Sequence, residues 1–464
     1  MAQALGSQTV CGPQFLQSLP QRIVAARSAS QSRESSITDL GLTDALDRLL
    51  PPLNDDASFW WRTTGKTMTN MLYQASYDPD SLIRNLLFFR STVIPYMGYR
   101  PISAGGAPSS CRSYVCDDHS PIEYSWSWDG GKGKTQKIRF TIEPLGADSG
   151  NANDPFNQAM TEQYLGELSS LSAKTDCTIH DHFARNLLPS NTSTAVSVIN
   201  SRASPNSHRS SMFVATELET AGPTVKTYLM PMLRALETSQ SRTSLLASTL
   251  TSFNSSYPQH SIPAFSSLIS YLSDSPLGKT TEIEMIAIDC TSPPTARVKI
   301  YPRSLATDWS TITSILTMNH TLAVSPTALA SLKALWYSVL SLPPSYPETL
   351  PLPTTCTRAE AGTFYCFYAR PGETQVKCKL YIPAKYYGQS DANIARGLSN
   401  YFQQRGKERE VASYWAVMEE MCQHRDLAEG CGLHSYISAE PKGDEVSVTS
   451  YFSPEINYSG RRWE

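Results

Sequence analysis

The sequence predicts an α+β fold in which ten antiparallel strands close into a barrel that is surrounded by helices. The first observation behind this prediction is a repeat, because the order helix–helix–strand–strand recurs about five times at a period of roughly 70–80 residues. The second is that the strands come in pairs joined by short turns, which is typical of antiparallel hairpins. The third is that polar and apolar side chains alternate along them, which gives each strand two different faces.

The first repeat opens with two predicted helices. Apolar residues recur at intervals of three and four over 57–75 and 80–95. Short β-like runs follow these helices, at 110–116, 121–128 and 136–143.

The four later repeats show the same order of elements. Their predicted helices span 156–171, 178–187, 240–252, 260–273, 307–318, 326–341, 390–403 and 406–423. Their predicted strands span 210–218, 223–230, 283–290, 296–302, 361–369, 374–382, 433–439 and 445–452. Short turns separate the paired strands, at Gly130-Gly131, Ala221-Gly222-Pro223, Pro293-Pro294, Pro371-Gly372 and Lys442-Gly443. Since the pattern continues through the Ser- and Pro-rich linkers, residues 39–464 are predicted to form a single domain.

Composition and charge narrow the class of protein. The 464 residues are 40% hydrophobic and 17% charged, as in a globular chain, and the net charge is −3. No overall field therefore favours binding to nucleic acid or to an anionic membrane. No apolar run has signal-peptide or membrane-spanning length, and no set of cysteines and histidines has zinc spacing. These observations favour a cytoplasmic protein with reduced thiols.

Residues 1–38 are predicted to be a disordered tail. The segment is rich in Ser, Gln and Ala and has no acidic residue before Glu34. Transit peptides have a similar composition, and that alternative stays open here. A polar segment without apolar periodicity is more typical of disorder.

Basic residues and tyrosines share one face of several predicted strands. Arg297, Lys299 and Tyr301 lie on one face, and the apolar residues between them lie on the other. Two further strands repeat the pattern, at Lys226 and Tyr228 and at Lys379 and Tyr381. If helices cover the apolar faces, the basic faces line the lumen, which is costly unless the lumen holds water and an anion. The alternative, in which these lysines face solvent from a half-exposed sheet, stays open at this point.

Other segments carry a family resemblance when they are taken in order along the chain. They include 117–126 (DDHSPIEYSW), 138–144 (IRFTIEP) with 148–157, the Lys–Tyr strands, 436–438 (YIS) and 451–455 (YFSPE). Over roughly residues 55–458 the chain resembles the fungal aromatic (indole) prenyltransferases of the dimethylallyltryptophan synthase (DMATS) family. The resemblance implies the ABBA (PT) barrel, whose ten antiparallel strands enclose a solvent-filled lumen and are ringed by helices. The repeat pattern agrees with it.

The resemblance also implies a reaction, in which a dimethylallyl group passes from its diphosphate to an aromatic acceptor without a metal ion or other cofactor. Neither Asp55-Asp56 nor Asp117-Asp118 belongs to a D-D-x-x-D motif, which holds magnesium in many prenyl-transferring enzymes. Fixed cations would then neutralise the diphosphate. The residues that the resemblance assigns to this role are Arg139, Lys226, Arg297, Lys299 and Lys379.

Two further roles follow from the resemblance. A shield of tyrosine rings would stabilise the allylic cation and exclude water. The resemblance places this shield at Tyr228, Tyr301, Tyr381, Tyr436 and Tyr451. Glu123, on the same strand face as Ser125 and Ser127, would be the general base that binds the N–H of an indole acceptor. The alternative for Glu123 is an ordinary half-exposed strand carboxylate.

The expected acceptor is tryptophan, an indole alkaloid or an indole diterpene, in fungal secondary metabolism. A phenolic or fused-ring polyketide is the alternative acceptor. A non-catalytic barrel that carries an anionic amphiphile is the alternative of a different class, because the same basic, tyrosine-rich lumen would suit it. The expected partners are the two small-molecule substrates, without nucleic acid or membrane, and the chain is expected to be a monomer or a homodimer.

Overall fold

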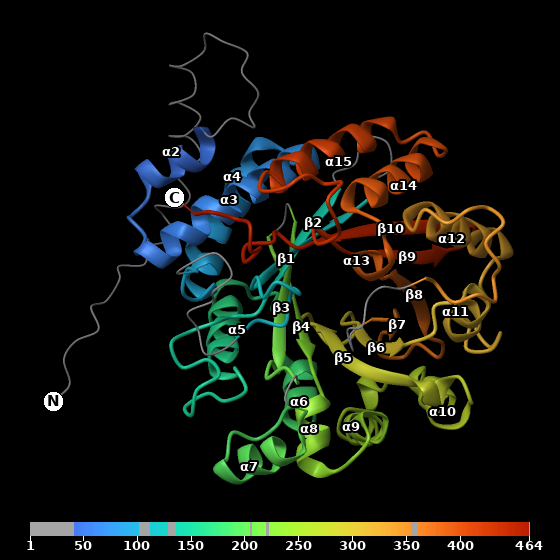
Figure 1. Cartoon of the computed structure of the whole chain (residues 1–464). Helices are drawn as coiled ribbons and strands as arrows, with labels where there is room; N and C mark the ends of the chain where they lie inside the picture. The colour runs from blue at the N-terminus through green and yellow to red at the C-terminus, as the bar shows by residue number, and fades with distance from the viewer. Residues whose placement is uncertain are drawn as a thin grey trace.

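The computed structural model describes residues 41–101, 112–128, 136–204, 207–219, 222–353 and 361–463. Within these residues, ten strands form one closed barrel in which all neighbours are antiparallel. Each strand pairs with the strands before and after it in the chain, and β1 pairs with β10 to close the ring. The predicted fold class is therefore confirmed (Figure 1). The tail predicted for 1–38 lies outside the described residues.

The strands agree closely with the predicted ranges from 121 onward. They are β1 Ile122–Ser127, β2 Lys137–Ile142, β3 Met212–Leu218, β4 Thr224–Leu229, β5 Thr281–Asp289, β6 Val298–Ser304, β7 Thr363–Ala369, β8 Lys377–Ile382, β9 His434–Lys442 and β10 Glu445–Phe452. Alternating polarity identified them because one face of each strand packs on helices while the other faces the lumen.

The strand predicted at 110–116 is wrong for its described part, 112–116, which has no strand and bends at 114–116. The backbone of this segment binds a buried carboxylate rather than a neighbouring strand. Glu143 Oε2 accepts hydrogen bonds from Tyr114 N and from Ser113 Oγ, both at 2.9 Å. Asn157 Nδ2 donates to the other oxygen of Glu143 at 3.0 Å. These contacts satisfy polar groups that a strand would have paired along a ladder.

Helices surround the barrel (Figure 1). They are α2 Gly41–Leu49, α3 Asp55–Gln74, α4 Pro79–Phe88, α5 Ala159–Leu171, α6 Thr178–Leu187, α7 Ser193–Arg202, α8 Met232–Thr238, α9 Arg242–Ser256, α10 Phe265–Asp274, α11 Trp309–Leu316, α12 Pro326–Val339, α13 Ala384–Tyr387, α14 Asp391–Gln403 and α15 Glu408–Met421. Helices α2, α7, α8 and α13 were not predicted, and the last two have only seven and four residues, too few to give a clear helical period. No helix of the described residues is long and apolar enough to cross a membrane.

Side-chain caps fix where several of these helices begin. Asn54 Oδ1 accepts a hydrogen bond from Ala57 N at 2.8 Å, and Asp308 Oδ1 accepts one from Thr311 N at 2.8 Å. Each cap satisfies an amide that has no partner within its helix.

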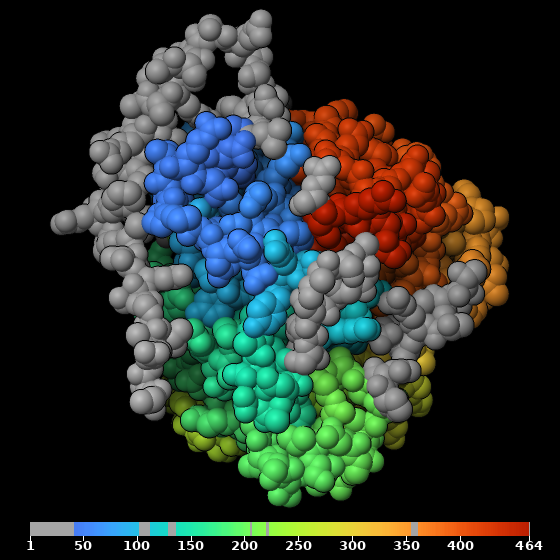
Figure 2. All heavy atoms as spheres, turned by 60° about the vertical axis from the view of Figure 1, so that its left-hand side comes forward, coloured from blue at the N-terminus to red at the C-terminus, as the bar shows by residue number. Residues whose placement is uncertain are grey.

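Helices α3 and α15 come from opposite ends of the chain and close the ring of helices, as β1 and β10 close the barrel. Helix α3 packs on α15, where Asn70 Nδ2 donates to the carbonyl of Ala416 at 3.3 Å. Figure 2 shows the early helices (blue) against the last elements (red) on one face of the molecule. The two ends of the described chain therefore meet beside β1.

The main hydrophobic core lies between the barrel and the helices. On β1 and just after it, Tyr124, Trp126 and Trp128 point outward and are fully buried. The rings of Trp126 and Trp128 stack with centroids 4.2 Å apart, and Phe402 of α14 lies 5.2 Å from Trp128. With the apolar faces covered from outside, the polar faces line the lumen, as the sequence predicted.

Candidate active site in the barrel lumen

The lumen side chains form layers because alternate residues of each strand point inward. Along β4, Lys226 and Tyr228 point inward, while Val225 and Leu229 belong to the outer core. The same step of two places a basic residue before a tyrosine on β6 and β8, at Lys299 and Tyr301 and at Lys379 and Tyr381. One layer of the lumen is therefore charged, and the next is aromatic.

The five tyrosines named from the sequence lie together in the aromatic layer, here called the tyrosine belt. Ring centroids are 5.9 Å apart between Tyr228 and Tyr301, and 5.8 Å apart between Tyr301 and Tyr381. The ring of Tyr381 also lies 6.3 Å from Tyr436 and 5.5 Å from Tyr451. The Tyr381 and Tyr451 hydroxyls are hydrogen-bonded at 3.2 Å. The belt is thus one connected surface.

The first part of the charged layer is built around Glu217 of β3. Its Oε2 accepts hydrogen bonds from Lys226 Nζ at 2.7 Å and from Arg139 Nε at 2.6 Å. Burial lowers the pKa of Lys226 to about 7, and the charge of Glu217 opposes that shift. Burial alone would raise the pKa of Glu217, but the charges of Lys226 and Arg139 hold it below its usual value. The three groups therefore depend on one another for their charges.

Two further carboxylates hold the remaining cations. Asp289, at the end of β5, binds Lys299 and also Arg297, whose Nε lies 2.6 Å from Oδ2. Glu440 of β9 lies 3.1 Å from Lys379 Nζ and accepts a hydrogen bond from the Tyr368 hydroxyl.

The structure brings together all five cations named from the sequence. These five cations share three carboxylates, Glu217, Asp289 and Glu440. The sequence reasoning missed the three acids, although each lies at a lumen-facing position of its strand. Applying the same alternation to β3, β5 and β9 would have pointed to them.

Glu123 of β1 lines a cavity that the tyrosine belt also lines. Burial raises the pKa of its carboxyl to about 7, while a hydrogen bond from Ser435 and the charge of Lys385 lower it. Lys385, in α13, is bound to Asp117 at 2.6 Å, and its Nζ lies 5.1 Å from the Tyr436 ring centroid. Sequence reasoning gave Lys385 no role, because 262 positions separate it from Glu123 along the chain.

A second ion pair lines the same cavity. Arg303 of β6 reaches Glu284 of β5 with its Nε at 2.9 Å and one terminal nitrogen at 2.6 Å. Arg242, at the start of α9, binds the other oxygen of Glu284 at 2.8 Å. The cavity therefore has aromatic walls and charged groups at fixed places, which is typical of small-molecule sites.

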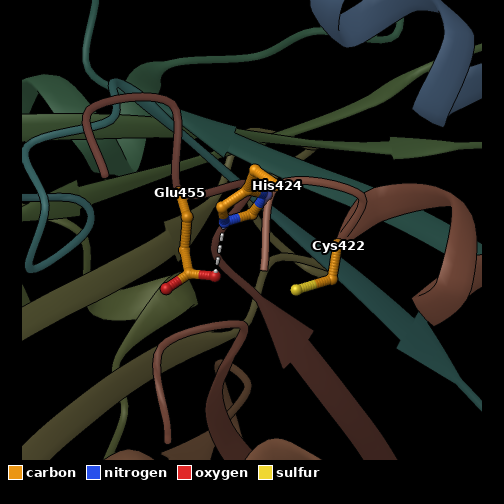
Figure 3. A group of neighbouring side chains, drawn as sticks. All are labelled: Cys422, His424 and Glu455. Atoms are coloured by element: carbon orange, nitrogen blue, oxygen red, sulfur yellow. Dashed lines mark hydrogen bonds and ion pairs between the residues drawn. The ribbon is translucent and has the colours of Figure 1, made fainter. Parts of the chain in front are cut away.

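Among the described residues, one cluster has metal-ligand chemistry: Cys422, His424 and Glu455 (Figure 3). His424 and Glu455 point toward each other, with 3.1 Å between Nε2 and Oε2. Arg425 also binds Glu455, at 2.8 Å, and Asp391. The oxygens of Glu455 are therefore already bound by a protein cation, Arg425. None of the three residues lines the lumen cavity.

The chain is similar to known proteins over most of its length, which bears on the class of protein to which it belongs. The tryptophan dimethylallyltransferase family matches residues 56–417. A 4-O-dimethylallyl-L-tyrosine synthase of Claviceps purpurea is 30% identical over 401 residues, covering 85% of this chain and 87% of that protein. A 7-dimethylallyltryptophan synthase of Aspergillus fumigatus is 29% identical over 426 residues, covering 89% and 88%. The crystal structure of AnaPT from Neosartorya fischeri superposes with a TM-score of 0.76 at 21% identity, over 89% of this chain and 97% of that one.

A closed ten-stranded barrel with helices outside and a charged, tyrosine-lined lumen defines, together with these relatives, an aromatic prenyltransferase. The chain belongs to the tryptophan dimethylallyltransferase family. The resemblance read from the sequence is therefore confirmed, and the non-catalytic carrier is set aside.

Proposed function

We propose that this enzyme transfers a dimethylallyl group from dimethylallyl diphosphate to an indole acceptor, and that no metal ion takes part. The observation that supports this proposal is that a charged layer and an aromatic layer adjoin in the lumen. Five cations lie next to five connected tyrosine rings, and Glu123 lines the cavity bounded by the same rings. An allylic diphosphate has matching parts, namely an anionic head and a short apolar tail.

The charged layer would bind the diphosphate. Glu217, Asp289 and Glu440 hold the lysines and arginines in place before the donor arrives, so little reorganisation is needed when it binds. The diphosphate oxygens would then accept hydrogen bonds from the same ammonium and guanidinium groups, which stabilises the leaving group as its charge grows.

The tyrosine belt would surround the dimethylallyl group as its bond to the diphosphate breaks. Ring faces stabilise a cation through their quadrupoles and do not capture it as water would. Burial raises the pKa of Tyr228, Tyr301 and Tyr381, so these hydroxyls stay neutral. A neutral phenol can donate to a diphosphate oxygen and is a poor nucleophile.

Glu123 would orient and activate the acceptor. As a carboxylate it accepts the N–H hydrogen bond of an indole, which makes the ring a better nucleophile. The ring then forms a bond to the allylic carbon while the diphosphate leaves, and the ring proton is lost last. A base whose pKa is about 7 can hold or release a proton near neutral pH.

Tryptophan or a tryptophan-derived indole is the proposed acceptor. The relative from Aspergillus fumigatus is named for tryptophan, and it matches this chain over nearly its whole length. A phenol is the second candidate, because the relative from Claviceps purpurea is named for tyrosine. We also propose that the enzyme is cytoplasmic and that it is a monomer or a homodimer.

Product analysis tests the acceptor. The enzyme is incubated with dimethylallyl diphosphate and with tryptophan, a tryptophan-containing cyclic dipeptide, tyrosine or a fused-ring phenol, and the products are identified by mass spectrometry and NMR. We expect a single prenylated indole product. Turnover of the phenols alone would select the second candidate, and prenylation of none of the four would contradict both.

A further inference from the structure

Two cysteines lie side by side on the outer face of the barrel, behind the charged layer. Cys177 directly precedes α6, and Cys290 directly follows β5. The backbone brings them together, since Asp176 N donates a hydrogen bond to the carbonyl of Cys290 at 3.2 Å. Each thiol also shifts the pKa of the other. Backbones that are held together in this way give the two cysteines the proximity that a disulfide bond requires.

The two thiols differ in access. Cys290 is 1% exposed, and Thr227 Oγ1 lies 3.9 Å from its sulfur. Cys177 is only partly buried, and Ser169 Oγ lies 3.7 Å from its sulfur. A small reagent can therefore reach Cys177 directly, whereas Cys290 is reached only through its neighbour.

The two thiols also differ in acidity. The neighbouring Cys290 thiol lowers the pKa of Cys177 to about 7, and a place at the amino end of a helix likewise favours the thiolate. The neighbouring Cys177 thiol and burial both raise the pKa of Cys290. Cys177 is thus the thiolate that attacks the oxidant first, and Cys290 is the thiol that reacts second.

We propose that Cys177 and Cys290 are a modification site, at which a low-molecular-weight disulfide such as oxidised glutathione introduces an intramolecular disulfide bond. Cys177 attacks one glutathione sulfur, which forms a mixed disulfide and releases the first glutathione thiol. Cys290 then loses its proton and attacks the Cys177 sulfur, which releases the second glutathione. Two protein thiols are oxidised, and one glutathione disulfide is reduced to two thiols.

The bond would act on the charged layer. Cys290 directly follows Asp289, the carboxylate that binds Arg297 and Lys299. Drawing the end of β5 toward α6 displaces this carboxylate, so the Michaelis constant for the prenyl diphosphate rises. This second part of the proposal rests on the proposed diphosphate role of the two cations.

Peptide mapping tests the disulfide. The full-length protein is incubated with oxidised glutathione, alkylated and digested, and linked peptides are identified by mass spectrometry. We expect a Cys177–Cys290 link that dithiothreitol removes. Cys177→Ser should abolish the link, whereas Cys431→Ser, which changes another partly buried cysteine, should leave it intact. A map without this link, from protein whose circular dichroism is unchanged, would overturn the proposal.

Kinetics of the same samples test the second part. We expect a donor Michaelis constant that is raised in the linked protein, restored by dithiothreitol and unaffected by oxidised glutathione in Cys177→Ser. An unchanged constant in protein shown to be linked would overturn the second part. It would leave the disulfide and the prenyl transfer itself standing, since turnover is measured in the same assay.

Discussion

Lys226 and Glu217 form an ion pair inside the barrel, with 2.7 Å between Nζ and Oε2 and side chains that are 7% and 6% exposed. Burial lowers the pKa of Lys226 to about 7, and Glu217 opposes that shift. Glu217 therefore favours the protonated form in a place where burial favours a neutral amine. The proposed donor site depends on charges that are held in this way.

Replacing Lys226 with methionine should weaken donor binding. One charge-assisted hydrogen bond to the diphosphate is lost, so the donor Michaelis constant should rise roughly tenfold to a hundredfold. Steady-state kinetics at several donor concentrations measure this. Lys137→Met is the matched control, since Lys137 binds the same Glu217 but its side chain is 52% exposed. Equal effects of the two substitutions would count against a specific role for Lys226.

Glu123→Gln should lower turnover without preventing donor binding. A lost general base costs roughly a hundredfold to ten-thousandfold in rate, and the charged layer is untouched. Turnover and calorimetric binding of a non-hydrolysable donor analogue are measured in parallel. Glu162→Gln is the control, because burial also raises the pKa of that carboxyl although it does not line the cavity. A Glu123→Gln enzyme with normal turnover would remove Glu123 from the mechanism.

The dependence of kcat/KM on pH should follow the ionisation of the Glu123 carboxyl. Its folded pKa of about 7 lies above the usual value, so the carboxylate is lost as the pH falls through about 7, and kcat/KM should fall with it. Lys385 lowers this pKa, so Lys385→Met should move the acid limb to higher pH, by about one unit. Lys385→Arg should restore its position. A loss of activity that is independent of pH would show that Lys385 is merely structural.

Opening the tyrosine belt should let water capture the allylic cation. Tyr301 links Tyr228 to Tyr381, so Tyr301→Ala interrupts the belt between them, and prenyl transfer should fall roughly tenfold. The fraction of donor converted to dimethylallyl alcohol should rise, which chromatography of the products measures. Tyr301→Phe keeps the ring and should keep the partition close to that of the unchanged enzyme. An unaltered partition in Tyr301→Ala would contradict the shielding role.

The sequence was sufficient to predict the barrel and the contents of its lumen where local rules apply. A strand has a period of two, so Lys226 and Tyr228 had to share a face. Family resemblance then added Glu123 and Tyr451, whose neighbours alone do not distinguish them from ordinary strand residues.

The partners of these residues could not be predicted in the same way. Lys226 is directly opposite Asp289 in the β4–β5 register, yet its close carboxylate is Glu217 of β3. Lys385 meets Asp117 across 268 positions of the chain. Such contacts depend on strand register and on barrel closure, which a single sequence does not specify.

Protein cations are proposed to neutralise the leaving diphosphate, so turnover should persist when all metal is removed. The enzyme is stripped of metal and assayed with excess EDTA, with and without added magnesium. We predict equal rates of prenylated product formation in the stripped and magnesium-supplied samples. A rate that collapses in EDTA and returns only with a divalent cation would show that the protein cations do not replace a metal ion.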